Sequence, residues 1–496
     1  MSPTTPVTLA VTSEMMAKYE PVIGLEVHVQ LKTKTKAFCA CSTQFGDPPN
    51  SNTCPVCLGL PGALPVLNRA ARDLAVRAAL ALGCKIQERS VFARKNYFYP
   101  DLPKGYQISQ YELPLALEGS LEIEVDGAKK KIGITRVHME EDAAKNLHEG
   151  FPDSDRWSYI DYNRCGMPLI EIVSEPDIRT PAEAYSYLTT LKQILEYTDV
   201  SDCNMEEGSL RCDANVSVRL RGASKFGTKV EAKNLNSFRY LAHALEYEIE
   251  RQIGVLESGG TITQETRLWN VAAGRTESMR SKEFAHDYRY FPDPDLLPVS
   301  AAPALVEQVR REMPELPGAK RARFIADYGI SAYDAGVLTS TRELASYFEA
   351  VVRAGANAKS AASWISVELL RRLNDAGKTI EECPVAPEAL AELLGVVERG
   401  EITAASGKKV FSEMFDTGKK PAEIITAGGL AQISDSSAIE TIARAIVAKS
   451  PDNVAKYKTG NEGVFKFFVG QVMRETKGQA NPQIVNAILK RVLAEA

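Results

Sequence analysis

The sequence predicts an α+β protein in which a largely antiparallel sheet domain is followed by domains made only of helices. Runs in which apolar and polar residues alternate, as in half-buried strands, lie before residue 298, and almost no strand pattern follows it. After this point the apolar residues recur at helical spacing, with glycines between the runs. The proline-rich stretch 291–298 separates the two patterns, so we place a domain boundary there.

The length of 496 residues also requires more than one domain, because single hydrophobic cores stop growing at about 300 residues. We predict a sheet domain over residues 1–297, a helical linker domain over 298–407 and a helical tail domain over 408–496. The second boundary follows from the segment 400–409, which interrupts the helical pattern.

Composition and charge restrict the classes of function. With 44% hydrophobic and 25% charged residues, the chain is typical of soluble globular proteins. The net charge of -5 argues against a protein that coats nucleic acid by bulk attraction, so any contact with RNA must be local. The sequence has no targeting signal and no apolar run of about 18 residues that would span a membrane. We therefore expect a cytoplasmic protein without a membrane partner.

Individual strands and helices can be placed along the chain. Strands are predicted at 21–31, 120–126, 132–137, 168–174, 210–221 and 228–233. Helices are predicted at 67–82 and 181–198 in the sheet domain, and at 436–449 and 462–477 in the tail. Gly83 marks the end of the first helix, and Thr180 with Glu183 gives a capping box at the start of the second.

The first predicted strand carries a polar face. Its apolar residues alternate with Glu26 and His28, which share the opposite face at a separation of roughly 7 Å. For these two residues alone, an ordinary solvated face is a better explanation than a binding site.

Further acids in the other strands favour a site. Asp213 lies on the polar face of a strictly alternating strand, although Asp is a poor strand former. Glu171 lies inside an apolar run, Glu231 lies between two lysines on one face, and residues 140–142 are consecutive acids. A charge in such a run is rarely buried unless it is paired or binds a metal. Several carboxylates with one imidazole suit Mg²⁺ or Mn²⁺ better than catalytic zinc, so we favour a hard-cation site over a solvated face.

Four of the nine cysteines lie close together in the sequence, at Cys39, Cys41, Cys54 and Cys57. Two pairs at this spacing can close a tetrahedral thiolate shell, which leaves no open position for catalysis. The pattern therefore predicts a structural zinc ion. Two alternatives are cysteines used as small apolar core residues and a redox-active pair, and both are weaker explanations of the spacing.

The segment 94–111 interleaves basic and aromatic residues in a loop marked by prolines. Such a loop can stack a base or ribose while Lys95 or Lys104 contacts phosphate, as in nucleotide sites and single-stranded nucleic-acid sites. A tyrosine-rich packed loop is an equally good explanation of this segment. No phosphate-binding P-loop motif occurs, and the glycine-containing stretch 222–228 is typical of a hairpin loop.

The sequence also contains seven long motifs, at 22–29, 95–101, 161–171, 205–215, 231–238, 287–293 and 477–482. With these motifs the chain resembles the GatB family, the B-type subunits of the glutamine-dependent aspartyl/glutamyl-tRNA amidotransferases. The resemblance covers nearly the whole chain, and each motif is far more specific than a short pattern.

The resemblance implies a reaction in two steps on Glu-tRNA(Gln) or Asp-tRNA(Asn). ATP first phosphorylates the side-chain carboxylate, and ammonia then displaces the phosphate to form the amide. It also implies two partners in a heterotrimer: an amidase (glutaminase) subunit, which releases ammonia from glutamine, and a small third subunit. The sheet domain corresponds to the catalytic cradle of this family, and the tail domain to the part that meets tRNA.

The resemblance further implies roles for individual residues. The Mg²⁺ ligands correspond to Glu26, His28, Glu141 and Glu231, and structural zinc belongs to those family members that keep the four cysteines. We assign catalytic roles to Lys95, Glu171 and Asp213, and contacts with ATP to Lys95, Tyr97, Lys104 and Arg211. Two other functions stay open as alternatives: a non-catalytic scaffold that binds tRNA, and a metal-dependent hydrolase that acts alone.

Overall fold

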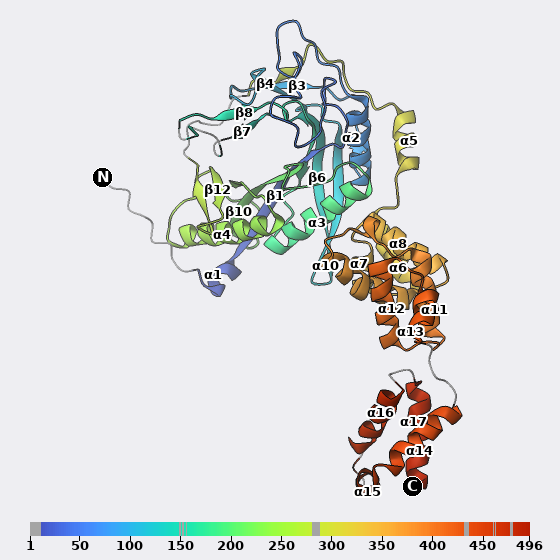
Figure 1. The fold of residues 1–496 in the computed structure, drawn as a ribbon. Coiled ribbons are helices and arrows are strands. Elements are labelled where there is room, and N and C mark those ends of the chain that lie inside the picture. Colours follow the sequence, from blue (N-terminus) through green and yellow to red (C-terminus); the bar gives the residue numbers. More distant parts are fainter. Residues whose placement is uncertain are drawn as a thin grey trace. The chain divides into compact units, whose positions relative to one another are not determined.

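The computed structural model describes residues 11–147, 150, 153–154, 156–279, 288–430, 436–459, 461, 463–476 and 480–496 (Figure 1). Three predictions reach beyond these residues: Asp287 of one motif, 477–479 of another, and the two end residues, Glu462 and Lys477, of one predicted helix. The chain divides into two compact units, Met1–Leu316 and Pro317–Ala496. The predicted α+β class is confirmed, because unit 1 contains the sheet and unit 2 contains only helices among its described residues.

Unit 1 is built around a nine-stranded sheet with the order β13-β12-β11-β10-β1-β9-β6-β5-β2. Its strands are β1 (Tyr19–Gln30), β2 (Lys85–Ile86), β5 (Ala116–Val125), β6 (Ala128–Glu141), β9 (Pro168–Ser174), β10 (Leu210–Leu220), β11 (Val230–Lys233), β12 (Thr266–Asn270) and β13 (Arg275–Ser278). All neighbours pair antiparallel except β11 and β12, which are parallel. The six strands predicted from alternation are all present.

One face of this sheet is apolar and is covered by helices (Figure 1). In β1 the alternation buries Ile23, Leu25 and Val27 against α2 (Arg69–Ala81), α3 (Pro181–Tyr197) and α4 (Phe238–Glu257). Because successive side chains of a strand point to opposite faces, the polar residues between them are left on the other face. The packing of the helices therefore determines which side of the sheet is available for chemistry.

Local signals begin and end these helices as expected. The side chain of Asn68 accepts hydrogen bonds from the amides of Ala70 and Ala71, so α2 begins at Arg69. Thr180 caps α3 through the amide of Glu183, as the capping signal predicts. The β5–β6 hairpin turns at Asp126 and Gly127, both of which have positive φ, a conformation that glycine adopts at little cost.

Smaller elements complete unit 1. A second sheet has the order β14-β3-β4, with β3 (Ala93–Asn96), β4 (Tyr106–Ser109) and β14 (Phe291–Pro292), and a third pairs β7 (Lys145–Leu147) with β8 (Tyr159–Asp161). The helices α1 (Ser13–Lys18) and α5 (Pro303–Glu312) also belong to this unit. Val309 of α5 packs into the core of unit 1, which explains why unit 1 extends to Leu316 and does not end at residue 297.

Unit 2 is helical throughout its described residues. Its elements are α6 (Pro317–Tyr328), α7 (Ala332–Leu338), α8 (Arg342–Arg353), α9 (Ala358–Trp364), a π-helical turn (Ile365–Leu369), α10 (Leu370–Asp375), a 3-10 turn (Ile380–Glu382), α11 (Pro387–Glu398), α12 (Ala404–Thr417), α13 (Pro421–Gly428), α14 (Ser436–Ala448), α15 (Pro451–Lys458), α16 (Gly463–Glu475) and α17 (Pro482–Glu495). They bury two separate hydrophobic clusters, one containing residues 324–424 and the other residues 439–493. No helix among the described residues is long and apolar enough to cross a bilayer.

The break predicted at 400–409 is shorter in the structure. Thr403 caps α12, which begins at Ala404, and its residues Val410 and Met414 pack into the first cluster of unit 2. A boundary at 407/408 lies within this helix. The division into three domains therefore stays a prediction.

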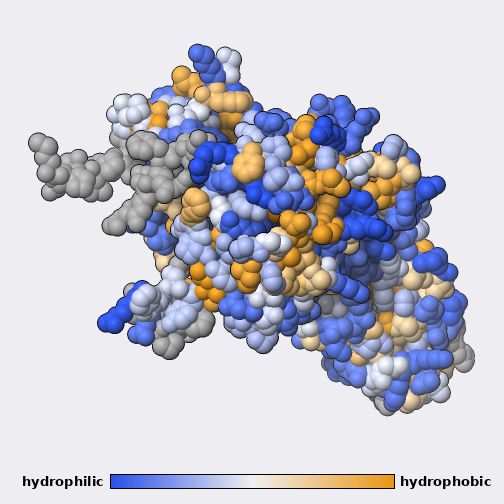
Figure 2. Space-filling view, turned by 90° about the horizontal axis from the view of Figure 1, so that it is seen from above, coloured by the Kyte–Doolittle hydropathy of each residue, from blue (hydrophilic) through white to orange (hydrophobic). Residues whose placement is uncertain are grey.

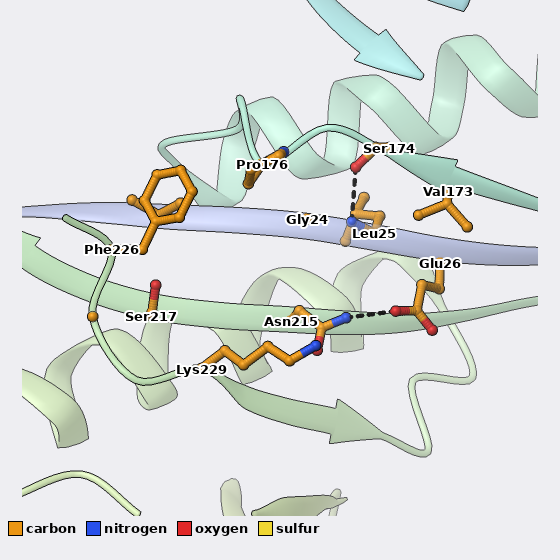
Figure 3. Close-up of a pocket in the computed structure, with 12 residues that line it drawn as sticks. Gly24, Leu25, Glu26, Val173, Ser174, Pro176, Asn215, Ser217, Phe226 and Lys229 are labelled. Carbon is orange, nitrogen blue, oxygen red and sulfur yellow. Dashed lines mark hydrogen bonds between the residues drawn. The ribbon is translucent and has the colours of Figure 1, made fainter. Parts of the chain in front are cut away.

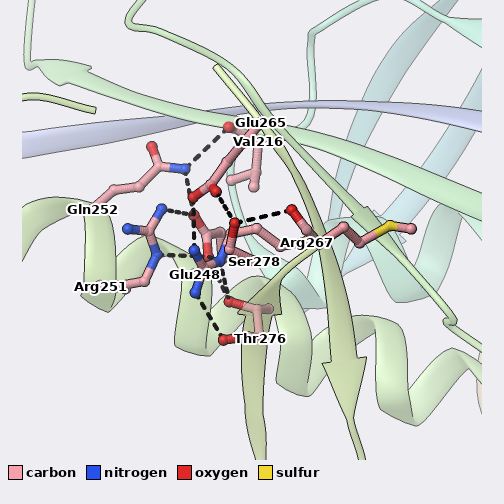
Figure 4. Close-up of polar contacts among 9 residues, drawn as sticks. Val216, Glu248, Arg251, Gln252, Glu265, Arg267, Thr276 and Ser278 are labelled. Atoms are coloured by element: carbon pink, nitrogen blue, oxygen red, sulfur yellow. Dashed lines mark hydrogen bonds and ion pairs between the residues drawn. The ribbon is translucent and has the colours of Figure 1, made fainter. Parts of the chain in front are cut away.

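A buried ionic network fixes the β12–β13 hairpin to α4 (Figure 4). Glu248 of α4 is fully buried and accepts hydrogen bonds from Arg251 at 2.9 Å, Gln252 at 3.0 Å and Thr276 at 2.8 Å. Arg267 of β12 lies 3.5 Å from the same carboxylate. Two arginines thus share one buried acid, so removing its charge leaves both without that partner.

We expect Glu248→Gln to lower the free energy of opening of this region by about 3 kcal/mol, because breaking a buried ion pair leaves an uncompensated charge. Native-state hydrogen exchange of the α4 amides measures the change. Glu250→Gln is the matched control, since Glu250 lies exposed on the same helix. Equal exchange in the two variants would contradict a stabilising role for the network.

Candidate active site and metal centre

The polar face of the nine-stranded sheet gathers ionisable side chains from four adjacent strands. His28 of β1 is opposite Arg211 of β10 on one side and Glu171 of β9 on the other, and Glu171 is opposite His138 of β6. One row of the sheet thus runs Arg211, His28, Glu171, His138. Side chains opposite each other in antiparallel strands approach within about 5 Å, so pairing alone brings these groups into contact.

His28 lies at the centre of a cluster with two carboxylates. Its Nε2 is 3.3 Å from Glu140 Oε1 and 3.3 Å from Glu171 Oε2. Burial alone would lower the pKa of His28, but the hydrogen bond to Glu171 and the charge of Glu140 raise that pKa to about 9. The two carboxylates therefore require positive charge between them. A proton on His28 supplies it, and so does a divalent cation bound by all three residues.

The cluster has the geometry of a cation site. One ligand atom from each of His28, Glu140 and Glu171 lies within 4.8 Å of the other two. Glu140 is 4% exposed, and its burial raises the pKa of the carboxyl, so its ionised form needs a counter-charge. Carboxylate oxygens with one imidazole are suitable ligands for Mg²⁺ or Mn²⁺, so the residues present fit such an ion.

His138 supports this cluster from β6. Its Nε2 lies 3.4 Å from Glu171, and burial lowers the pKa of the imidazole to about 4, so His138 is neutral at physiological pH. Its Nδ1 has no hydrogen-bond partner among the described residues. A neutral imidazole packed this close to a carboxylate restricts the orientation of that carboxylate, as residues next to metal ligands commonly do.

A second group of acids lies one row further along the face. Glu26 accepts a hydrogen bond of 2.8 Å from Asn215, and its pKa is raised first by burial and then by the charges of Glu171 and Glu231. Lys233 binds Asp213 at 2.7 Å and Glu231 at 3.2 Å. Repulsion between these acids is therefore only partly offset by the lysine.

The structure separates Glu141 from the rest of the predicted cation ligands. Glu141 accepts a hydrogen bond of 2.9 Å from the amide of Ile108 and forms an ion pair with Lys104. Strand alternation turns its side chain away from the face that His138 and Glu140 share. Glu26, His28, Glu171, Asp213 and Glu231 do lie together on the polar face, and Glu140 and His138, to which the sequence analysis gave no role, join them. The alternation of β6 carries the signal that would have selected Glu140.

The residues predicted to contact ATP lie in three different environments. Lys95 of β3 is 4.9 Å from the centre of the Tyr288 ring and close enough to help lower the pKa of Glu171. Tyr97 packs edge-on against the same tyrosine at 6.0 Å. Arg211 pairs with the buried Asp142 at 2.9 Å, whereas Lys104 is paired with Glu141. Of the four, Lys95 and Arg211 lie beside the carboxylate cluster.

A cavity of about 310 Å³ lies beside Glu26, which forms part of its lining (Figure 3). Its lining includes Gly24, Glu26, Pro176, Asn215, Phe226 and Lys229. The walls are largely apolar, and the carboxylate of Glu26 and the ammonium of Lys229 supply charge at the rim. This volume is at the lower end of the range for small-molecule sites.

The four clustered cysteines converge although no regular element holds them. All four sulfur atoms lie within 4.8 Å of one another, and Cys54 Sγ and Cys57 Sγ are 3.8 Å apart. Sulfur atoms at the corners of a tetrahedral zinc site are also about 3.8 Å apart. The amide of Cys54 donates to Cys57 Sγ at 3.1 Å. The cluster can therefore hold a structural metal ion.

Comparison with known proteins assigns this chain to a family. A family model described as the GatB/GatE catalytic domain matches residues 21–307, which is more than half of the chain. A second model, described as the GatB domain, matches residues 346–493. The chain belongs to the GatB family. The first match spans every side chain of the polar face discussed above.

Relatives in the GatB family match the chain along nearly its whole length. The B subunit of the aspartyl/glutamyl-tRNA(Asn/Gln) amidotransferase of Carboxydothermus hydrogenoformans is 57% identical over 480 residues, covering 97% of this chain and 100% of the relative. The proteins of the same name from Geobacter sulfurreducens and Solidesulfovibrio magneticus are 58% and 55% identical, and each alignment covers 96% of this chain and at least 99% of the relative.

We expect Glu171→Gln to weaken Mn²⁺ binding about tenfold, because the number of charged ligands tunes cation affinity. Glutamine keeps the shape of the side chain and removes its charge. Titration followed by electron paramagnetic resonance measures the free ion. Glu175→Gln, at an exposed position of the same segment, is the control. Unchanged affinity of the Glu171 variant would exclude this carboxylate from the cation site.

Proposed function

We propose that this chain activates the side-chain carboxylate of Glu-tRNA(Gln) or Asp-tRNA(Asn) with ATP and then amidates it with ammonia. As a member of the GatB family it is a subunit of a tRNA-dependent amidotransferase, an enzyme that forms a carbon–nitrogen bond. The observation that carries the proposal is the cluster of His28, Glu140 and Glu171, which lies between the cavity beside Glu26 and the lysine Lys95.

The chemistry requires neutralisation of negative charge. A carboxylate and the γ-phosphate of ATP repel each other, and phosphoryl transfer depends mainly on positioning and on electrostatic stabilisation. Mg²⁺, when bound, neutralises phosphate oxygens; His28, Glu140 and Glu171 would hold it, with Glu26 and Glu231 as candidate ligands in the next row. Lys95 and Arg211 would contact phosphate oxygens directly. Lys104 would first have to leave its ion pair with Glu141.

Two regions would hold the substrates on either side of the cation. The cavity beside Glu26 suits the nucleoside of ATP, because Phe226 offers a face for stacking and Lys229 a charge for phosphate. Lys95 and Tyr97 would then contact the γ-phosphate of ATP where it meets the aminoacyl end of the tRNA. Asp213 would act on the reaction by holding Lys233, to which it is bound at 2.7 Å.

The same proposal includes the metal and the partners implied by the family. Zinc in the four-cysteine cluster would be structural, since four thiolates fill its coordination shell. We also propose two partners, an amidase subunit together with a small third subunit, and a cytoplasmic location, where thiols stay reduced. Figure 2 shows apolar residues exposed among the polar residues of the surface. Large exposed apolar side chains, such as those of Phe45, Val66 and Phe98, would offer surfaces for contact between subunits.

The decisive experiment follows the γ-phosphate of labelled ATP in the purified complex with charged Glu-tRNA(Gln) or Asp-tRNA(Asn). We expect phosphate on the aminoacyl group only when Mg²⁺ is present, and about a hundredfold slower transfer in Lys95→Met, because a charge that stabilises the transition state is lost. Lys85→Met, at an exposed position, is the control.

Transfer that never reaches the aminoacyl group would refute the mechanism. Turnover without ATP would favour a hydrolase, and unchanged amidation in Glu231→Ala would favour a scaffold.

A second expectation separates nucleoside binding from chemistry. Phe226→Ala should raise the KM for ATP about tenfold with little change in kcat, because a stacking contact that is present before and during transfer contributes binding alone. Steady-state amidation assays over a range of ATP concentrations measure both constants. Trp157→Ala removes an exposed aromatic side chain elsewhere in unit 1 and serves as control. A normal KM in the Phe226 variant would exclude this cavity as the nucleoside site.

A further inference from the structure

Lys36 is a fully buried lysine next to the cysteine cluster. Its exposed fraction is 0%, which is rare for lysine. Its Nζ donates to the carbonyl oxygen of Asn52 at 2.7 Å and to that of Tyr162 at 3.2 Å, and it lies 3.8 Å from Cys57 Sγ. These three contacts surround the charged end of the side chain.

A buried ammonium group needs negative charge nearby. No carboxylate of the described residues lies within 4.0 Å of Lys36 Nζ. Two neutral carbonyl groups satisfy its hydrogen bonds but not its charge, and an unpaired buried charge is costly. The remaining neighbour is the sulfur of Cys57. Glu141 also borders Gly166, 3.9 Å from the position of a Cβ there, but its carboxylate is paired with Lys104. An anionic cysteine cluster is therefore the charge in direct contact with the ammonium of Lys36.

A tetrathiolate metal site supplies this charge. Four thiolates around one Zn²⁺ carry a net charge of two minus, which is itself unfavourable in a buried position without a cation. We propose that Lys36 is the counter-cation of a divalent metal centre formed by Cys39, Cys41, Cys54 and Cys57. The inference rests on the proposed zinc site and adds a residue and a charge state to it.

The same lysine connects the metal centre to the polar face of the sheet. Tyr162, whose carbonyl accepts from Lys36, begins the loop that joins β8 to β9. The amide of Ala37, next to Lys36, donates to the carbonyl of Gly166 at 2.8 Å, and the amide of Gly166 donates to the carbonyl of Asp142 at 2.9 Å. The side chain of Asp142 in turn holds Arg211.

Gly166 packs closely against Cys57 and Lys36. It has a φ of +81°, and a Cβ atom there would lie 3.5 Å from Cys57 Cβ and 3.6 Å from Lys36 Cδ. The loop 162–167 therefore lies directly on the cysteine cluster and on the stem of the lysine. Lys36 acts as a positioning residue: when the cluster is charged, the lysine holds the loop that orients Asp142 and, through it, Arg211.

The test compares Lys36→Met with Lys34→Met in the full-length chain. Methionine retains most of the apolar stem and removes the charge, and Lys34 is an exposed lysine of the same segment. Competition for Zn²⁺ against a colorimetric chelator should show affinity lowered by about ten- to hundredfold in Lys36→Met only, the range expected for a residue that supports metal ligands. Equal affinity in the two variants would overturn the inference while leaving the zinc site intact.

A thermal measurement distinguishes charge compensation from simple packing. Zinc should raise the melting temperature of the wild-type chain and of Lys34→Met by the same amount, and that of Lys36→Met by less. A merely structural lysine predicts the same loss of stability with and without metal, and that result would also overturn the inference. If the wild-type chain takes up no zinc, the proposed metal site itself fails.

Hydrogen exchange in the wild-type chain tests the link without any substitution, and it decides the matter if Lys36→Met does not fold. Removing zinc should increase exchange at the amides of residues 162–167, because the buried ammonium then lacks its counter-charge. The amides of α3, which lie in the core of unit 1, are the internal reference. Exchange in the loop that is unchanged by metal removal would contradict the coupling.

Discussion

The supply of positive charge to a crowded set of carboxylates is the constraint on which the site depends. Glu26, Glu140 and Glu171 lie on one sheet face and are largely removed from water, and burial raises the pKa of the first two. His28 can carry a proton between Glu140 and Glu171, and Lys233 meets the acids of the next row. The negative charge of these carboxylates exceeds the positive charge that His28 and Lys233 supply. A divalent metal ion stabilises such a site most.

The fold produces this arrangement because only one face of the sheet is covered by helices. Antiparallel pairing fixes which residues are opposite each other, and a shift by one residue would exchange the polar and apolar faces of a strand. The single parallel pair, β11 with β12, positions one of the acids: the hydroxyl of Thr266 of β12 donates a hydrogen bond of 2.7 Å to Glu231 of β11. That strand is held by Arg267 and the buried Glu248, so a network in the core reaches the acids of the polar face.

Alternation along single strands was sufficient to predict most of the sheet and to place Glu26, His28, Glu171, Asp213 and Glu231 on its polar face. It could not say which strands are neighbours, since β1 pairs with β9 and β10, far away in the sequence. Residues 140–142 show this limit: the family resemblance selected Glu141, alternation along β6 places Glu140 with His138, and pairing with β9 brings Glu140 to His28. Likewise, short strands such as β3 depend on tertiary pairing, and α12 begins inside a segment whose glycine and charges suggested a break.

The loop 162–167 shows how two separate charge systems can determine one position. It lacks the ladder of hydrogen bonds that holds a strand, so its conformation depends on what binds its ends. On one side Lys36 and the proposed metal centre hold the carbonyl of Tyr162, and on the other Asp142 accepts from Gly166. Asp142 is buried, and the arginines beside it help keep its pKa below the usual range although burial opposes this. On the proposals above, a metal centre that fills its own coordination shell would influence the polar face without contacting a substrate, because it would fix the backbone that positions Asp142 and, through it, the side chain of Arg211.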